Sequence, residues 1–341
     1  MTASSPPVAA TPGPAAGDRA VVLALRALHA GPVVILVLLL VAMTALSPYF
    51  LTGRNLTNLG FQASFVAVLA LGQLLVILTR GIDLSVGSVV GLTGVAALAA
   101  GGSGALGSAV FVLAGAAIGL VNGGVQVWGR IANPFIVTLG TLGIVRGLAL
   151  VISDGETKTG FPDVVETLGS GEVGPVPVPV LLVAVLGGLT ATLLGRTQWG
   201  RWIYAVGGNP DGARRAGLPV DRVLLSVYVM SGVAAGVAGM LVAGRTGAAS
   251  PQAGQLLELD AITAVIIGGA SFLGGRGRVG NVIAGALIIG VIRNGLDLLS
   301  VSPFWQLIAI GTLVIVSLQL DVLRGSLETR LRAARGQAAE A

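Results

Sequence analysis

The stretch GGNPDGARRAGLP, residues 207–219, is a short polar segment between two long apolar runs, and it carries the signals that begin a helix. Asn209 is a residue type favoured at the N-cap, and Pro210 suits the first helical position, where its missing N–H group costs nothing. Asp211 is favourable in the first turn because it lies at the positive end of the helix dipole. The segment therefore predicts a helix that begins at Pro210.

The same segment carries the signals that end a helix. Gly217 readily adopts the left-handed conformation found after a helix C-terminus, and Pro219 prevents continuation. Together these signals predict a helix over residues 210–216, with Arg214 and Arg215 near its end. Because a helix this short is marginal in water by itself, we expect it to dock on another surface.

Apolar residues dominate the rest of the chain. Hydrophobic residues make up 54% of it and charged residues 10%, whereas a soluble domain is about 25% charged. Since a bilayer core needs roughly 20 apolar residues per helix, the apolar runs predict an all-α, polytopic integral membrane protein with about ten transmembrane helices. Continuous apolar runs exclude the alternating strands of an outer-membrane barrel. The predicted spans are 30–47, 59–79, 84–100, 106–128, 134–152, 179–194, 223–243, 261–273, 279–299 and 303–320.

These spans predict a single transmembrane domain over residues 30–320. Residues 1–29 are interpreted as a cytoplasmic N-terminal tail, partly disordered because its start is rich in Pro, Ala, Ser and Thr. Residues 321–341 form a cytoplasmic C-terminal tail, and 196–222 a cytoplasmic loop. The first span exceeds a normal signal-peptide h-region and further spans follow it, so we interpret it as an anchor.

The basic residues predict the orientation. If the N-terminus is cytoplasmic, nearly all Arg residues of the loops and tails are cytoplasmic too, as the positive-inside rule predicts. The basic residues that fall outside are Arg54, Lys158 and Arg245. Both termini are then cytoplasmic, and the loop 153–178 lies outside. The basic balance of the chain needs no nucleic-acid partner.

The numbers of glycine, cysteine and histidine residues bear on helix packing and on the metal and disulfide sites that the chain could form. The 53 glycines favour close helix packing in a bilayer. The chain has no cysteine, so disulfides and thiolate metal sites are excluded. The lone His29 lies beside the first span, where an interfacial residue is commoner than a ligand. We predict no metal site.

The chain contains a weak internal repeat. GAAIGLVNGG (115–124) resembles GALIIGVIRNG (285–295), so the third to fifth spans correspond to the eighth to tenth. The predicted orientation places Asp83 on the inner face and Asp260 on the outer face, which makes the repeat inverted. Inverted repeats are typical of transporters, with the substrate path at their interface. Chance similarity between Gly-rich apolar segments is the alternative.

Polar residues in the matched elements are candidates for a translocation path. For each of them, capping or interhelical hydrogen bonding is the alternative interpretation. The candidates are Asp83, Ser85, Ser88, Thr93, Asn122, Asp260, Thr263, Ser271 and Asn294.

Three charges lie inside predicted spans, where charges are costly and face the bundle interior. Arg293 and Asp297 are four residues apart on one helix face and are predicted to pair, as a structural pair rather than a proton relay. Arg146 has no obvious partner, so we expect it to contact backbone carbonyls or the aqueous path.

Soluble-enzyme chemistry has no signature in the chain. A Walker A loop, HExxH and GxSxG are all absent from the sequence. We therefore predict no catalytic residues, and any uphill transport must draw its energy from an ion gradient or another chain. A self-contained ion-coupled secondary transporter is one alternative, and a membrane scaffold or intramembrane enzyme is another.

Several motifs resemble one transporter family. In order along residues 50–320, the chain resembles the permease subunits of ATP-binding cassette importers for monosaccharides, the ribose, xylose and galactose branch. The motifs are LTRGIDLSVGS (78–88), NPFIVTLGTLGIVRGLALV (133–151), YAVGGNPDGARRAGL (204–218), ELDAITAVIIGGASFLGGRGRV (258–279) and GALIIGVIRNGLDLLSVS (285–302).

The resemblance implies a complex in the bacterial inner membrane that works by alternating access. Two permease chains, identical or different, form the pore. Two ATP-binding subunits or one tandem ATPase bind ATP and Mg, whereas this chain itself binds no cofactor. An extracytoplasmic sugar-binding protein delivers the substrate and docks on outer loops, including 153–178 and 245–258.

The resemblance also gives the predicted short helix a role. In this family the loop between the sixth and seventh spans carries a coupling helix that sits in a groove of the ATPase. Gly212 stands where relatives often have Ala. Gly is less favourable than Ala in a helix by about 1 kcal/mol. The coupling residues carried over are Gly207, Gly208, Asn209, Pro210, Asp211, Ala213, Arg214, Arg215, Gly217 and Leu218.

Overall fold

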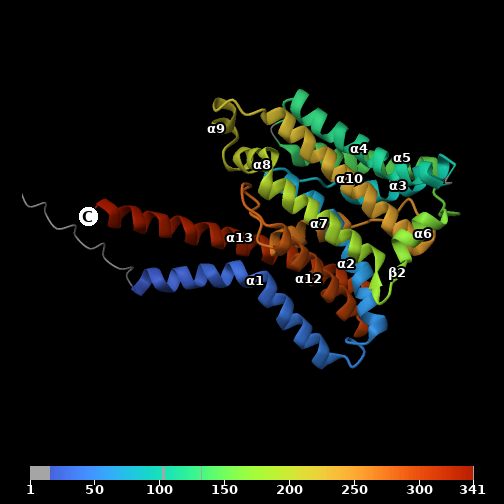
Figure 1. Cartoon of the computed structure of the whole chain (residues 1–341), viewed down its shortest axis with the longest axis horizontal. Helices are drawn as coiled ribbons and strands as arrows, with labels where there is room; N and C mark the ends of the chain where they lie inside the picture. The colour runs from blue at the N-terminus through green and yellow to red at the C-terminus, as the bar shows by residue number, and fades with distance from the viewer. Residues whose placement is uncertain (1–15, 102–103, 132, 341) are drawn as a thin grey trace, which may run out of the picture.

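The computed structural model describes residues 16–101, 104–131 and 133–340 as a bundle of helices (Figure 1). The first helix, α1, spans Ala16–Leu46 and so begins well before the predicted span at residue 30. Residues 1–15, where the disordered part of the tail is predicted, lie outside the described residues.

The first half of the bundle is followed by an irregular segment with short strands. After α1 come α2 (Gly53–Leu78), α3 (Val86–Ala99), α4 (Gly104–Trp128) and α5 (Pro134–Ser153). The segment 154–177 then contains β1 (Lys158–Thr159), α6 (Asp163–Ser170), β2 (Glu172–Val173) and β3 (Val176–Pro177). The strands β2 and β3 form a hairpin, and β1 pairs antiparallel with β4 (Ala248–Ala249).

The second half contains the loop with the predicted short helix. Its elements are α7 (Val178–Arg196), α8 (Gln198–Gly208), α9 (Pro210–Arg215), α10 (Val220–Thr246), β4 (Ala248–Ala249), α11 (Leu257–Ile267), α12 (Val279–Leu298) and α13 (Pro303–Glu340). In Figure 1, α8, α9 and the C-terminal end of α13 lie toward one end of the molecule, and α6 and β2 lie toward the other.

The predicted all-α polytopic membrane fold is confirmed. Among the described residues, seven helices are long and apolar enough to cross a membrane: α2, α5, α7, α10, α12 and parts of α4 and α13. The predicted count of ten is not confirmed. The apolar helices 31–46 and α3 are shorter, and the predicted span 261–273 corresponds to α11, which ends at Ile267. At about 1.5 Å per residue, α11 is roughly half the ~30 Å of a bilayer core.

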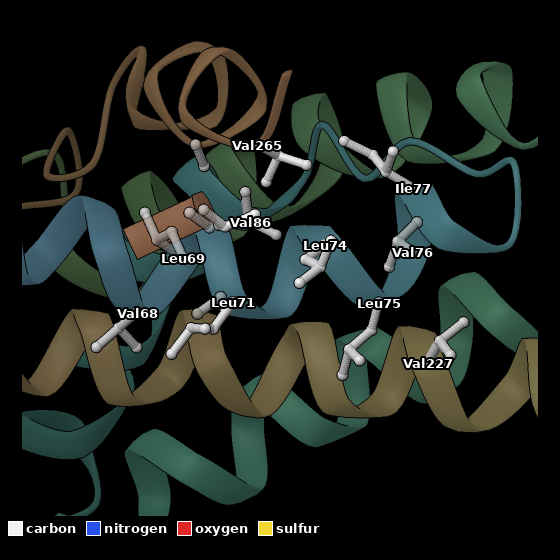
Figure 2. Close-up of a cluster of buried hydrophobic side chains, with 14 of the residues drawn as sticks. Val68, Leu69, Leu71, Leu74, Leu75, Val76, Ile77, Val86, Val227 and Val265 are labelled. Atoms are coloured by element: carbon white, nitrogen blue, oxygen red, sulfur yellow. The ribbon is translucent and has the colours of Figure 1, made fainter. Parts of the chain in front are cut away.

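Helix α2 forms the centre of the bundle. Its side chains from Val66 to Leu78 are nearly all buried, and it contacts α7, α10, α11 and α12. Figure 2 shows side chains of α2 with Val227 of α10, Val86 of α3 and Val265 of α11 around them. Because α2 touches so many helices, a displacement of its end is transmitted through packed contacts rather than absorbed.

Small residues let α4 and α10 cross closely. A Cβ on Gly115 would meet the backbone of Gly232, and one on Gly232 would meet the backbone of Gly115. Gly119 is closed off in the same way by the backbone of Tyr228. The expectation that glycines serve close helix packing is therefore confirmed at this crossing.

The two halves share one pattern of contacts. The short helix α3 packs against α4 and α5, and the short helix α11 packs against α12 and α13. Both short helices precede the segments matched in the internal repeat. The inverted relation between the halves stays a prediction.

Candidate functional site

The start of α9 is built as its residue types require. Asn209 adopts an extended backbone, and its side chain accepts a hydrogen bond from the Gly212 N–H at 2.9 Å. Pro210 occupies the first turn, where Asp211 also lies. The prediction of a helix that begins at Pro210 is confirmed.

The end of α9 is closed by a double hydrogen bond. Gly217 has a φ of 79°, in the left-handed region. Its N–H donates to the Arg214 carbonyl at 3.1 Å, and the Leu218 N–H donates to the Ala213 carbonyl at 3.0 Å. This is the Schellman arrangement, and it ends the helix at Arg215, one residue before the predicted end.

One face of α9 is exposed on the surface of the chain. Ala213 is buried toward the rest of the chain, whereas Asp211, Arg214 and Arg215 are exposed. Arg214 forms an ion pair with Asp221 at 2.8 Å, and both side chains are more than half exposed. A surface pair of this kind contributes little to stability, so these side chains remain accessible to another protein.

Arg80 connects the residues before α9 to the central helix. It lies just after α2 with a φ of 67°. Its Nε donates to the Gly207 carbonyl and its Nη2 to the Gly208 carbonyl, each at 2.6 Å. These carbonyls end α8, where a cation is favoured by the helix dipole.

The loop between α11 and α12 closes the same junction. The Gly275 N–H donates to the Leu78 carbonyl at 2.9 Å, and the Tyr204 hydroxyl donates to the Gly277 carbonyl at 2.8 Å. Burial raises the pKa of Tyr204, although the charge of Arg278 acts to lower it, so the hydroxyl stays protonated at neutral pH. We call Arg80, Gly207, Gly208, Gly275 and Tyr204 the α8 junction.

Three predicted path residues meet in a buried polar cluster. The Asp83 Oδ1 accepts from the Ser85 hydroxyl at 2.6 Å and from the Ser85 N–H at 3.0 Å. Asn122 of α4 donates to the Ser85 hydroxyl at 2.8 Å. Ser231 of α10, which sequence reasoning missed, donates to Asp83 Oδ2 at 3.0 Å. Donors therefore surround the Asp83 carboxylate.

The hydroxyl groups of Ser88, Thr93 and Thr263 bond within their own chain segments. Each donates to the carbonyl three or four residues earlier, and each residue is buried. Ser271 is buried as well, and its hydroxyl oxygen accepts from the Leu273 N–H at 3.3 Å. These contacts match the alternative that the sequence left open, and a role in the path stays a prediction.

The predicted pair of Arg293 with Asp297 is wrong. Arg293 pairs instead with Asp260 of α11, at 2.7 Å from Nη2 and 2.9 Å from Nε. Asp260 is fully buried, and a buried carboxylate needs a counter-charge more than an exposed one does. Asp297 accepts from Gln306 of α13 at 2.8 Å.

Asn294 takes part in a contact that the sequence does not reveal. Its amide and that of Asn55 in α2 exchange two hydrogen bonds, at 2.8 and 2.9 Å. Both side chains are buried. The pair joins α2 to α12 at Asn294, the residue directly after Arg293.

Arg146 holds a loop in place. Its Nη1 donates to the carbonyls of Pro251 and Ala253, at 2.5 and 3.0 Å, as expected from its lack of a sequence partner. Pro251 is buried, so this part of the predicted docking loop 245–258 is packed inward. Arg146 also lines a cavity of about 360 Å³ with Glu258, Gln252 and Gln255, which sequence reasoning missed.

The comparisons with known proteins identify the family. Residues 55–318 match the family model described as the permease component of the branched-chain amino acid transport system. The chain is 42% identical to the D-allose transport system permease protein of Escherichia coli K12, over 86% of this chain and 91% of the relative. It is 39% identical to the ribose import permease protein of the same strain, over 84% and 91%. The fructose import permease protein of Rhizobium meliloti is 37% identical, over 85% and 84%.

The chain belongs to this family of transport permeases, and it is a multi-pass membrane protein. The resemblance seen in its motifs is thereby confirmed. No solved structure matches the chain.

Proposed function

We propose that the chain is the membrane permease subunit of an ATP-driven importer that receives a monosaccharide from an extracytoplasmic binding protein. A second permease chain completes the pore, and separate ATP-binding subunits hydrolyse ATP with Mg. The complex lies in the bacterial inner membrane with both termini of this chain in the cytoplasm.

The names of the relatives support a sugar as the substrate. The family description names branched-chain amino acids. The relatives that align over more than four fifths of both chains name allose, ribose, fructose and galactose instead. Because these alignments include nearly the whole membrane domain, we take the monosaccharide class as the substrate class.

The observation that carries the proposal is the α8 junction beneath α9. The helix α9 has both ends capped and presents Arg214 and Arg215 outward. The end of α8, directly before it, is hydrogen-bonded to Arg80 at the end of α2. A coupling helix needs both properties, namely an accessible face for the ATPase and a firm connection to the membrane helices.

This connection supports a mechanism of alternating access. ATP binding closes the ATPase dimer and moves the two α9 helices of the complex together. The α8 junction passes the displacement to α2, which contacts α10, α11 and α12. The helices then reopen the pore toward the other side of the membrane.

The contacts of Asp83 disfavour a metal cation as the coupling ion. Cations such as Ca²⁺ and Mg²⁺ are held by several oxygen acceptors. Asp83 accepts hydrogen bonds from Ser85 and Ser231, so both of its carboxylate oxygens have partners without a bound metal cation. A second intramembrane carboxylate, Asp260, is matched by Arg293.

Co-purification tests the proposal. The tagged chain is extracted from its native membrane in mild detergent, its companions are identified by mass spectrometry, and ATP hydrolysis is assayed. We expect an ATPase that is lost when residues 209–217 are replaced by a Gly/Ser linker of equal length. A chain that purifies alone, even after cross-linking, would support the ion-coupled transporter instead.

A further inference from the structure

The cavity beside Arg146 is a polar site on a membrane helix. It has a volume of about 360 Å³ and lies between α5 and the residues that lead into α11. Its polar lining is formed by Arg146, Gln252, Gln255 and Glu258. The volume falls in the range of small-molecule sites.

Glu258 contributes a buried carboxylate to the lining of the cavity. Its side chain is about nine-tenths buried, and its Oε2 atom has no hydrogen-bond partner in the structure. A buried carboxylate oxygen without a partner is costly. Gly87 faces the same oxygen so closely that a Cβ there would meet it.

The backbone around the cavity is held in an unusual conformation. Leu256, which lines the cavity, has a φ of 68°, a value that costs energy for a branched apolar residue. Gly254 has a φ of 76° and meets the backbone of Gly87. Arg146 holds this loop through the carbonyls of Pro251 and Ala253. Strain that the surroundings maintain is typical of ligand sites.

The lining suits a neutral polyhydroxylated molecule. A carboxylate accepts from hydroxyl groups, a guanidinium donates to them, and each glutamine amide does both. Arg146 makes three hydrogen bonds to carbonyls, whereas a guanidinium has five donors. Leu142, Leu150 and Leu256 add apolar surface for the C–H faces of a sugar ring.

The cavity opens to the outer surface of the chain. Gln252 and Gln255 are exposed, as are Ile144 and Leu148 on the neighbouring surface of α5. Arg146 lies on a membrane helix, where a charged group that faces lipid is costly and marks a partner surface or a water-filled path. This surface therefore belongs at the pore between two permease chains.

We propose that the cavity lined by Arg146, Gln252, Gln255 and Glu258 is a transient monosaccharide subsite on the translocation path, an inference that rests on the proposed function. The exposure of Gln252 and Gln255 to solvent keeps the affinity low. A path site must release its substrate as readily as it binds it.

Cysteine protection tests the subsite directly, because the chain has no cysteine of its own. The complex carrying Gln255→Cys is reconstituted with its co-purified ATPase and binding protein and exposed to a hydrophilic maleimide. D-ribose, D-allose, D-fructose, D-galactose and L-leucine are compared as protecting ligands. Arg54→Cys, at the exposed start of α2 and outside the two named docking loops, is the control.

We expect the sugar that drives uptake to slow labelling of Gln255→Cys several-fold and to leave the control unchanged. Absence of protection by that sugar in a transporting complex would overturn the subsite, as would protection by L-leucine alone. A position that the hydrophilic reagent never labels faces lipid, which also overturns it. A wild-type complex that takes up none of the sugars contradicts the proposed function instead.

Uptake by a second variant gives an independent readout. In Glu258→Gln we expect sugar uptake to fall roughly tenfold, an effect of about 1.4 kcal/mol that is ordinary for a charged hydrogen bond. ATP hydrolysis stimulated by the binding protein should stay within about twofold of wild type. Arg54→Gln, at the exposed start of α2 and outside the two named docking loops, is the control. Unchanged uptake in Glu258→Gln and in Gln255→Ala would contradict the proposal.

Discussion

The Nε atom of Arg80 lies 2.6 Å from the carbonyl oxygen of Gly207, although the two residues are 127 positions apart in the chain. This hydrogen bond joins the end of the central helix α2 to the end of α8, directly before α9. It connects the loop to a membrane helix that is distant from it in the chain.

Replacing Arg80 with Gln tests this role. The loss of two charge-assisted hydrogen bonds, about 1–2 kcal/mol each at a part-buried site, should loosen the α8 junction. We expect the complex to hydrolyse ATP with less sugar transported per ATP. The ratio of uptake to hydrolysis in proteoliposomes measures this, with the exposed Arg196→Gln as the control. A wild-type ratio in Arg80→Gln would show that coupling runs through other contacts.

Two neighbouring glycines provide a matched pair. A Cβ on Gly207 would overlap the Leu78 carbonyl and crowd the Gly275 N–H, whereas a Cβ on Gly208 meets nothing within 4 Å. Gly207→Ala should therefore destabilise the protein by about 1–3 kcal/mol, and Gly208→Ala should be neutral. Thermal unfolding in detergent compares the two variants. Equal midpoints would mean that the junction is not packed as described.

The left-handed residue after α9 gives a third prediction. Gly217→Val places a β-branched side chain at a φ of 79°, which costs about 1–2 kcal/mol or more, while Asn tolerates this conformation. We expect Gly217→Val to lower binding-protein-stimulated ATP hydrolysis with normal membrane insertion, and Gly217→Asn to retain most of it. Normal stimulation in Gly217→Val would remove the role assigned to this helix end.

The exposed arginines of α9 are predicted to contact the ATPase. Reversal of Arg214 and Arg215 to Glu should reduce the amount of ATPase that co-purifies, and the loss should grow as salt is raised. Asp221→Asn is the control, because it removes the partner of Arg214 within the chain without changing the arginines. Unchanged assembly in the double reversal would exclude an electrostatic contribution.

The corrected ion pair gives the fifth prediction. Because Asp260 is fully buried, Arg293→Gln leaves an uncompensated charge and should cost about 3–5 kcal/mol. Asp297→Asn should cost much less, since Gln306 still has a polar partner. Thermal unfolding separates these outcomes, and Arg293→Gln combined with Asp260→Asn should recover part of the loss. Similar costs for the two single variants would favour the pairing along α12.

Features decided by neighbouring residues were predictable from the sequence. Asn209, Pro210 and Gly217 define the ends of α9 through hydrogen bonds that span only a few positions. The membrane fold followed from composition in the same way, since a bilayer imposes one length of apolar helix. Arg146 was correctly expected to contact backbone carbonyls, because no charge lies near it on its helix.

Contacts between distant segments were decided only by the tertiary structure. Arg293 has Asp297 within reach along α12, yet the packing of α11 against α12 brings the buried Asp260 closer to its guanidinium. Arg80 and the cavity around Glu258 likewise depend on how α2, α5 and α11 are placed. The sequence by itself determined the helices, the capped loop and the family, because these depend on local hydrogen bonding and on hydropathy. Which polar groups meet across helices depended on packing, because a buried charge is satisfied by whichever partner the fold brings within hydrogen-bond distance.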